Sequence, residues 1–184
     1  MKNLMATCPF YYVRVAAFFL EFCQWVDSTR LSAVVRHSQW MFDALDAVHT
    51  LGIVLVAGTI VLVDLRLLGL GVRRAQVSAV VSRIVPWTLS GFGLMLVTGG
   101  LLFWSEAVRM YDSTAFRVKL MLLLLAGLNA LVFHLTIYRQ AAAWDDETAL
   151  PWRAKLAGLA SLLLWIGIIV AGRAIAYGPG YDVD

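Results

Sequence analysis

The sequence has 184 residues, of which 61% are hydrophobic and 15% are charged, and its formal net charge is +3. Soluble domains are about 45–50% apolar and about 25% charged, so this composition excludes an ordinary soluble domain. The basic residues flank apolar runs rather than gathering on one polar surface, which indicates membrane topology and not nucleic-acid binding. The lipid bilayer is therefore the first partner that the sequence predicts.

The N-terminal part, residues 1–43, is expected to form amphipathic helices that lie at the membrane interface. Pro9–Val26 is strongly apolar but contains Arg14, Glu21 and Gln24. A charge at the centre of a span costs roughly 2.5–3.5 kcal/mol on insertion scales, whereas an interfacial helix keeps its charges at the level of the headgroups. The alternative prediction is a fifth span over the same residues. A second amphipathic helix is expected to follow.

This second helix is expected to begin at Asp27 or Ser28, because both residue types are good N-caps. It is expected to continue to about Phe42.

Four uncharged apolar runs are predicted to cross the membrane: Ala47–Val63, Ile84–Trp104, Leu120–Tyr138 and Leu156–Gly172. A spanning helix needs about 20 apolar residues, with a range of roughly 17–25, and all four runs qualify. The predicted fold class is therefore all-α, a polytopic membrane four-helix bundle over residues 44–178 with a short tail at 179–184. Glycine-rich faces in the second and fourth spans suit packing within the chain or between chains, so a homo-oligomer or other membrane subunits are possible partners.

Arginines indicate the orientation of the bundle. Arg66, Arg73, Arg74 and Arg83 lie between the first two spans, and basic residues close to the membrane favour the cytoplasmic side. This connection is expected to face the cytoplasm, with the protein in a bacterial inner membrane. The connection between the second and third spans, expected to include Lys119, then lies on the opposite side.

Polar side chains inside membrane spans are costly, so each is a candidate functional residue. We single out His49, Asp64, Arg66, Thr98, Asn129 and His134, with Ser90, Ser161 and Arg173 as further polar positions. Thr98 and Asn129 lie near the middle of their spans, where hydrogen bonds between helices are the expected role. No Walker-type glycine loop, HExxH or nucleophile elbow occurs, so the sequence does not favour an enzyme.

His134 is expected to point into the bundle and to meet Asp64. Gly127, Ala130 and His134 share one helical face, and small residues mark places where helices approach each other. Asp64 ends the first span at the level of His134. A buried pair of these side chains would relay protons or hold a cation, whereas the plainer alternative is a histidine bonded to a neighbouring helix, with Ser90 as a neutral partner.

Histidine is also a ligand of haem b and copper, so His49 and His134 are candidate cofactor-binding residues. At about 1.5 Å per residue the two lie roughly 20 Å apart in depth, too far for one haem iron. Met121 and His37 are alternative partners of His49. The favoured function is a small transport component or a non-catalytic accessory component of the membrane. The alternative is a haem- or copper-binding redox component that uses His49 and His134.

Several short strings occur in order: His49-Thr50-Leu51-Gly52, the DLRLLG string from Asp64, Pro86-Trp87, Thr98-Gly99, Asn129 with Phe133-His134, and Ala171-Gly172-Arg173. Together they resemble an uncharacterised bacterial multi-pass membrane protein family, a domain of unknown function, over about residues 25–178. The resemblance implies a multi-pass fold and no particular activity. The His-x-x-Gly opening is more distantly similar to the copper-resistance D and cytochrome b membrane families, although this chain lacks their paired histidines at matched depth.

Overall fold

A computed structural model describes residues 8–38, 40–70, 77–137 and 151–177, and these residues form helices without a β-strand among them. The elements in chain order are α1 (Cys8–Asp27), α2 (Arg30–His37), α3 (Met41–Leu67), α4 (Val77–Ser105), α5 (Ala107–Asp112), α6 (Thr114–Val132), the π-helical turn η1 (Phe133–Ile137) and α8 (Trp152–Ala176). In this described part, four helices are long and apolar enough to cross a membrane: Met41–Leu67, Val81–Ser105, Thr114–Thr136 and Trp152–Ala176. The chain is therefore an all-α polytopic membrane protein, as predicted.

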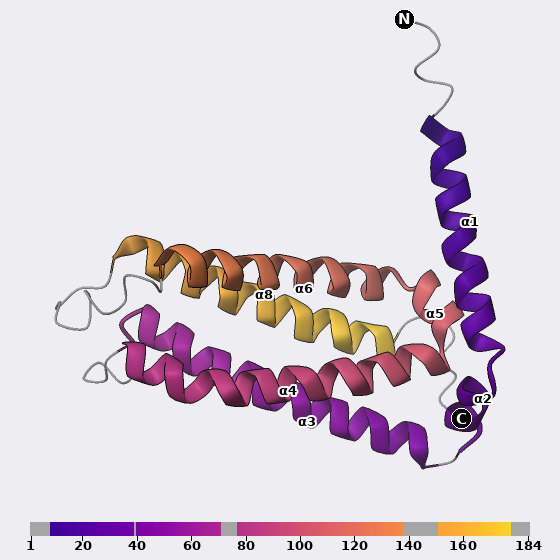
Figure 1. Cartoon of the computed structure of the whole chain (residues 1–184), viewed down its shortest axis with the longest axis horizontal. Helices are drawn as coiled ribbons and strands as arrows, with labels where there is room; N and C mark the ends of the chain where they lie inside the picture. The colour runs from indigo at the N-terminus through magenta and orange to yellow at the C-terminus, as the bar shows by residue number, and fades with distance from the viewer. Residues whose placement is uncertain (1–7, 39, 71–76, 138–150, 178–184) are drawn as a thin grey trace, which may run out of the picture.

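The four long helices lie alongside one another, and α1 crosses one end of them (Figure 1). We call this end the α1 end. Helices α3 and α6 begin there, and α4 and α8 finish there, so neighbours alternate in direction. Helix α3 packs against both α4 and α8, and α6 packs against α8. Helix α4 thus packs on α3, and helix α6 packs on α8, rather than on each other.

The third spanning helix begins earlier than predicted. Ser113 is its N-cap, with extended backbone angles (φ −73°, ψ 114°), and its hydroxyl accepts a hydrogen bond of 3.2 Å from the Phe116 amide. The helix therefore starts at Thr114 and not at Leu120. As a result Lys119 lies inside a spanning helix, whereas the sequence analysis placed it in the connection.

A small apolar core joins all four long helices. Val56, Met95, Trp165 and Ile168 are buried together, and Leu122 of α6 packs against them. Most other large apolar side chains of the four helices point outward, as expected where the surrounding solvent is lipid.

The second N-terminal helix begins later than predicted. Thr29 is the N-cap of α2, not Asp27 or Ser28, because Thr29 has the extended backbone (φ −71°, ψ 152°) that a cap requires. Its Oγ1 accepts a hydrogen bond of 3.4 Å from the Ser32 amide. Asp27 still belongs to α1, which ends there.

The same helix also ends earlier than predicted. It stops at His37 and not near Phe42, because Ser38 is extended (φ −84°, ψ 117°). Helix α3 then begins at Met41, so Phe42 belongs to the first spanning helix.

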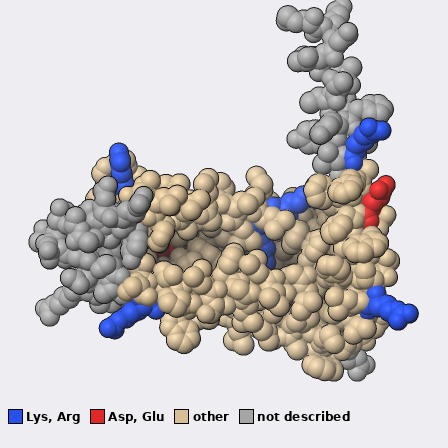
Figure 2. Space-filling view, viewed as in Figure 1, with Lys and Arg blue, Asp and Glu red and all other residues tan. Residues whose placement is uncertain are grey.

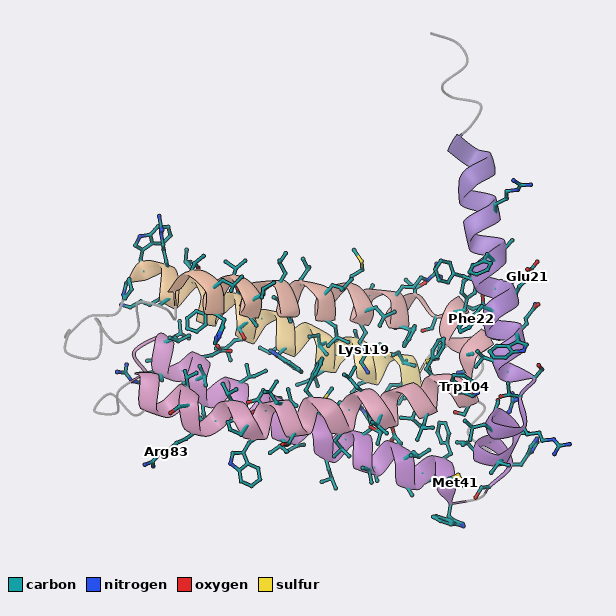
Figure 3. The ribbon with its side chains drawn as sticks, in the orientation of Figure 1. Glu21, Phe22, Met41, Arg83, Trp104 and Lys119 are labelled. Atoms are coloured by element: carbon teal, nitrogen blue, oxygen red, sulfur yellow. The ribbon has the colours of Figure 1, made fainter. Side chains whose placement is uncertain are left out.

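The last turns of α1 pack at the corner where α4 meets α5, near Phe22 and Trp104 (Figure 3). Cys23 and Val26 are buried there against Ala107. The Trp104 indole Nε1 donates a hydrogen bond of 2.8 Å to Thr29 Oγ1. Burial, and secondarily the charge of Asp112, raise the pKa of the Cys23 thiol, so it acts as an unreactive packing group.

Candidate functional site

The interior of the bundle contains polar side chains at two levels, one near each end. Figure 2 shows that the face bounded by α4 and α6 is hollowed part-way along its length, and Lys119 points into this space (Figure 3). We call this feature the α4–α6 groove. His49, Thr98 and Lys119 lie near the α1 end, whereas Asp64, Ser161 and Asn129 belong to the other end.

His49 is held by a hydrogen bond across the α3–α4 interface. It is 9% exposed, and its Nδ1 lies 3.0 Å from the Oγ1 of Thr98, which is itself 4% exposed. The Thr98 hydroxyl donates to the Leu94 carbonyl at 2.7 Å. Because a hydroxyl has one proton to donate, Thr98 accepts from His49, and Nδ1 carries a proton.

Two glycines make room for the polar side chains at this level. A Cβ on Gly99 would lie 2.9 Å from His49 Cε1, closer than atoms tolerate, so the ring packs directly on the α4 backbone. A Cβ on Gly172 of α8 would lie 3.7 Å from Lys119 Nζ. The charges of Lys119 and Asp46 both act on His49, so these three residues share one neighbourhood.

Asp64 lies at the other end, between α3 and α8. It is 4% exposed, and its side chain faces the Ser161 hydroxyl of α8. Its Oδ2 is buried without a hydrogen-bond partner among the described residues. Gly158 permits the approach of α8, because a Cβ there would lie 3.2 Å from the Asp64 carbonyl oxygen. A buried polar atom without a partner is costly, and such atoms are uncommon outside functional sites.

Asn129 connects α6 to α8, as the sequence analysis expected of a polar residue at mid-span. Its Nδ2 donates a hydrogen bond of 3.1 Å to the Ala157 carbonyl. It lies on the face of α6 that also carries Leu122 and Ala126, and Phe133 of η1 continues this face; these three side chains pack against the core clusters.

We expect Asn129→Ala to lower the free energy of unfolding by about 1 kcal/mol, the usual size of an interhelical hydrogen bond in a membrane. The Ala157 carbonyl remains part of the hydrogen-bonded backbone of α8. The variant therefore leaves no buried acceptor without a hydrogen bond, and the loss of stability is modest. Thermal unfolding in detergent measures the difference. A loss of more than about 3 kcal/mol would mean that Asn129 has a larger role than this single bond.

The prediction that His134 points into the bundle is wrong. His134, Gly127 and Ala130 are all exposed, so the face they share turns away from the core. The small side chains on this face had indicated a packing surface, but α6 packs against its neighbours through larger residues on another face. The expected contact between His134 and Asp64 is therefore replaced by one between Asp64 and Ser161.

The two histidines are not brought together. His49 is buried near the α1 end, whereas His134 is exposed in η1, at the far end of the third spanning helix. The alternative partners of His49 also lie elsewhere: Met121 is 62% exposed and His37 is exposed on α2. Arg66 is half-buried in the last turn of α3. The described residues contain no group of three His, Cys, Asp or Glu side chains arranged for a metal ion.

Sequence reasoning missed Lys119. It stands directly before a long apolar run and was therefore assigned to a connection. The available signal was Ser113-Thr114, because serine is a common N-cap and a helix that starts there carries Lys119 inward by more than one turn.

Four apolar helices with a few buried polar groups define this chain as a small polytopic α-helical membrane protein. More particularly, the chain belongs to a family of unknown function, DUF6644, whose model matches residues 22–178. No curated protein and no solved structure matches it.

Proposed function

We propose that this protein is a small transport component of the bacterial inner membrane that moves protons, with Asp64 as the proton-binding group. The observation that carries the proposal is Asp64 Oδ2, a carboxyl oxygen buried without a hydrogen-bond partner in the described part of the chain. Ionisable side chains at membrane depth are expensive and mark ion pathways and proton relays. A carboxyl group in this position binds and releases a proton without rearranging other bonds at Oδ2.

The other polar groups support a path rather than an isolated site. Ser161 faces the carboxyl group at one end, and His49 is bonded to Thr98 at the other. The two levels are about 22 Å apart along α3, from fifteen residues at about 1.5 Å each, so water has to connect them.

The proposal is tested by reconstituting the purified protein into liposomes that contain a pH-sensitive dye. A potassium gradient with valinomycin supplies the driving force. Wild-type vesicles should acidify faster than protein-free vesicles, and Asp64→Asn should reduce the protein-dependent rate by at least about tenfold, because an amide does not exchange the proton. Asp43→Asn, an exposed acid in the first turn of the same helix, is the matched control and should keep the wild-type rate.

Two outcomes contradict the proposal. One is a wild-type rate equal to that of protein-free vesicles. The other is an Asp64→Asn rate equal to that of the wild type.

A second candidate function, a haem- or copper-binding redox component, rests on the buried imidazole of His49. Its Nδ1 is bonded to Thr98, so Nε2 is the nitrogen that would bind a metal. The absorbance spectrum of the protein purified from its native membrane tests this candidate. A haem band that is lost in His49→Leu supports it, and a spectrum without such a band after expression with haem supplied opposes it.

We also propose that α1 lies at the membrane interface. Two observations support this: α1 crosses the end of the four long helices rather than joining them, and it presents exposed Phe18, Phe19, Phe22 and Trp25. Amphipathic helices with aromatic apolar faces bind at this level.

A further inference from the structure

Lys119 is a charged side chain held at a particular place inside a spanning helix. It is the sixth residue of α6, so it lies roughly 8 Å along the axis from the helix start. Its ammonium group does not point away from the protein, because Nζ lies beside Gly172 of α8.

Lys119 forms no ion pair with the acidic residues that the structure describes. No described acid approaches Nζ within 4.0 Å, although the charge of Asp46 acts on it from α3. Asp46 is itself exposed at the α1 end. His49 is the other titratable group in this neighbourhood, and its Nδ1 is bonded to Thr98. Lys119 therefore offers a positive charge in the groove that no described acidic residue contacts directly.

The groove is reached sideways, from the bilayer. Helix α4 packs on α3 and helix α6 packs on α8 rather than on each other, and the face between them is hollowed (Figure 2), with Lys119 pointing into this space (Figure 3). An occupant that enters from this side comes from the lipid, and apolar chains are what fill a hollow between apolar helices. Because Lys119 is positively charged, the headgroup of this occupant is expected to be anionic.

We propose that the α4–α6 groove is a binding site for an anionic phospholipid, with the phosphate against the Lys119 ammonium and an acyl chain along the hollow. Basic pockets between membrane helices commonly hold the headgroups of such lipids. A Cβ on Gly172 would lie 3.7 Å from Nζ, so this glycine lets α8 approach the Lys119 ammonium closely.

The test is a titration of the purified full-length protein in detergent with phosphatidylglycerol or phosphatidylcholine, with bound lipid counted by native mass spectrometry. Wild-type protein should bind phosphatidylglycerol more tightly than phosphatidylcholine. Lys119→Met should lower the affinity for phosphatidylglycerol about fivefold, the usual effect of one basic residue near a membrane surface. Lys119→Arg should keep most of the binding. Lys155→Met, which removes an exposed lysine of α8, is the matched control and should bind as the wild type does.

Several outcomes overturn the proposal. Equal affinity of the wild-type protein for the two lipids would do so, and this measurement does not depend on a variant that folds. Equal loss of binding in Lys119→Met and Lys155→Met would show that general surface charge, and not the α4–α6 groove, attracts the lipid. Competition by water-soluble glycerol phosphate would identify a free anion as the ligand, and a dimer that binds no lipid would identify a second copy of the chain as the occupant.

Discussion

Gly158→Val should lower the free energy of unfolding by about 3 kcal/mol, because this glycine sets the distance between α3 and α8. A Cβ at this position would lie 3.2 Å from the Asp64 carbonyl oxygen and 3.2 Å from Leu67 Cβ. Neither atom is the end of a flexible side chain, so neither turns aside. The two helices have to separate, which also loosens the packing of Leu67 against Ala154.

Thermal unfolding in detergent, followed by circular dichroism, measures this effect. Gly127→Val is the matched control, because it makes the same substitution in α6 where a Cβ would meet nothing within 4 Å. The control should change stability only by the difference in helix propensity, which slightly favours valine over glycine and is well under 1 kcal/mol. Equal losses in the two variants would show that Gly158 does not set the distance between α3 and α8.

Gly99→Val should destabilise the protein by about 2–4 kcal/mol through its effect on His49. A Cβ there would lie 2.9 Å from His49 Cε1 and 3.4 Å from Nδ1. The ring is buried and tied to Thr98, so it relieves the contact only by breaking the 3.0 Å hydrogen bond. The variant therefore combines an overpacked contact with a buried polar group that loses its partner.

A double-mutant cycle distinguishes this mechanism from a general disturbance of α4. In the His49→Ala background the ring is absent, so Gly99→Val should cost much less than it does in the wild type. Gly100→Val is the control at the neighbouring position, where a Cβ would meet nothing within 4 Å. If Gly99→Val lowers the free energy of unfolding equally in both backgrounds, the substitution does not act by displacing His49.

The fold class and the four spans were predictable from composition and from the length of the apolar runs. These are properties of the whole chain, and the bilayer imposes them regardless of which face of a helix packs where. The ends of the helices were less predictable, because they depend on single caps. Ser113 and Thr29 decided the starts of α6 and α2, and each differed from the predicted position.

The candidate site was predictable only in part. Asn129 and Thr98 form interhelical hydrogen bonds, as their positions at mid-span indicated. The orientation of His134 was not predictable, because in lipid both faces of a helix are apolar and periodicity no longer separates inside from outside. The contact of Asp64 with Ser161 was missed for a related reason, since it depends on which two helices are neighbours.

The path of the chain through the bundle has a mechanical consequence. Helices α3 and α4 form one helical hairpin, and α6 and α8 form another, because α3 and α6 run away from α1 and α4 and α8 return towards it. The two hairpins are joined covalently only through α5, where Arg109 also donates a hydrogen bond of 3.3 Å to the Ile175 carbonyl of α8. They also pack together at the opposite end, where Gly158 of α8 meets α3. A small separation of α3 from α8 at that end would admit water to Asp64, whereas His49 and Thr98, which belong to one hairpin, would stay together.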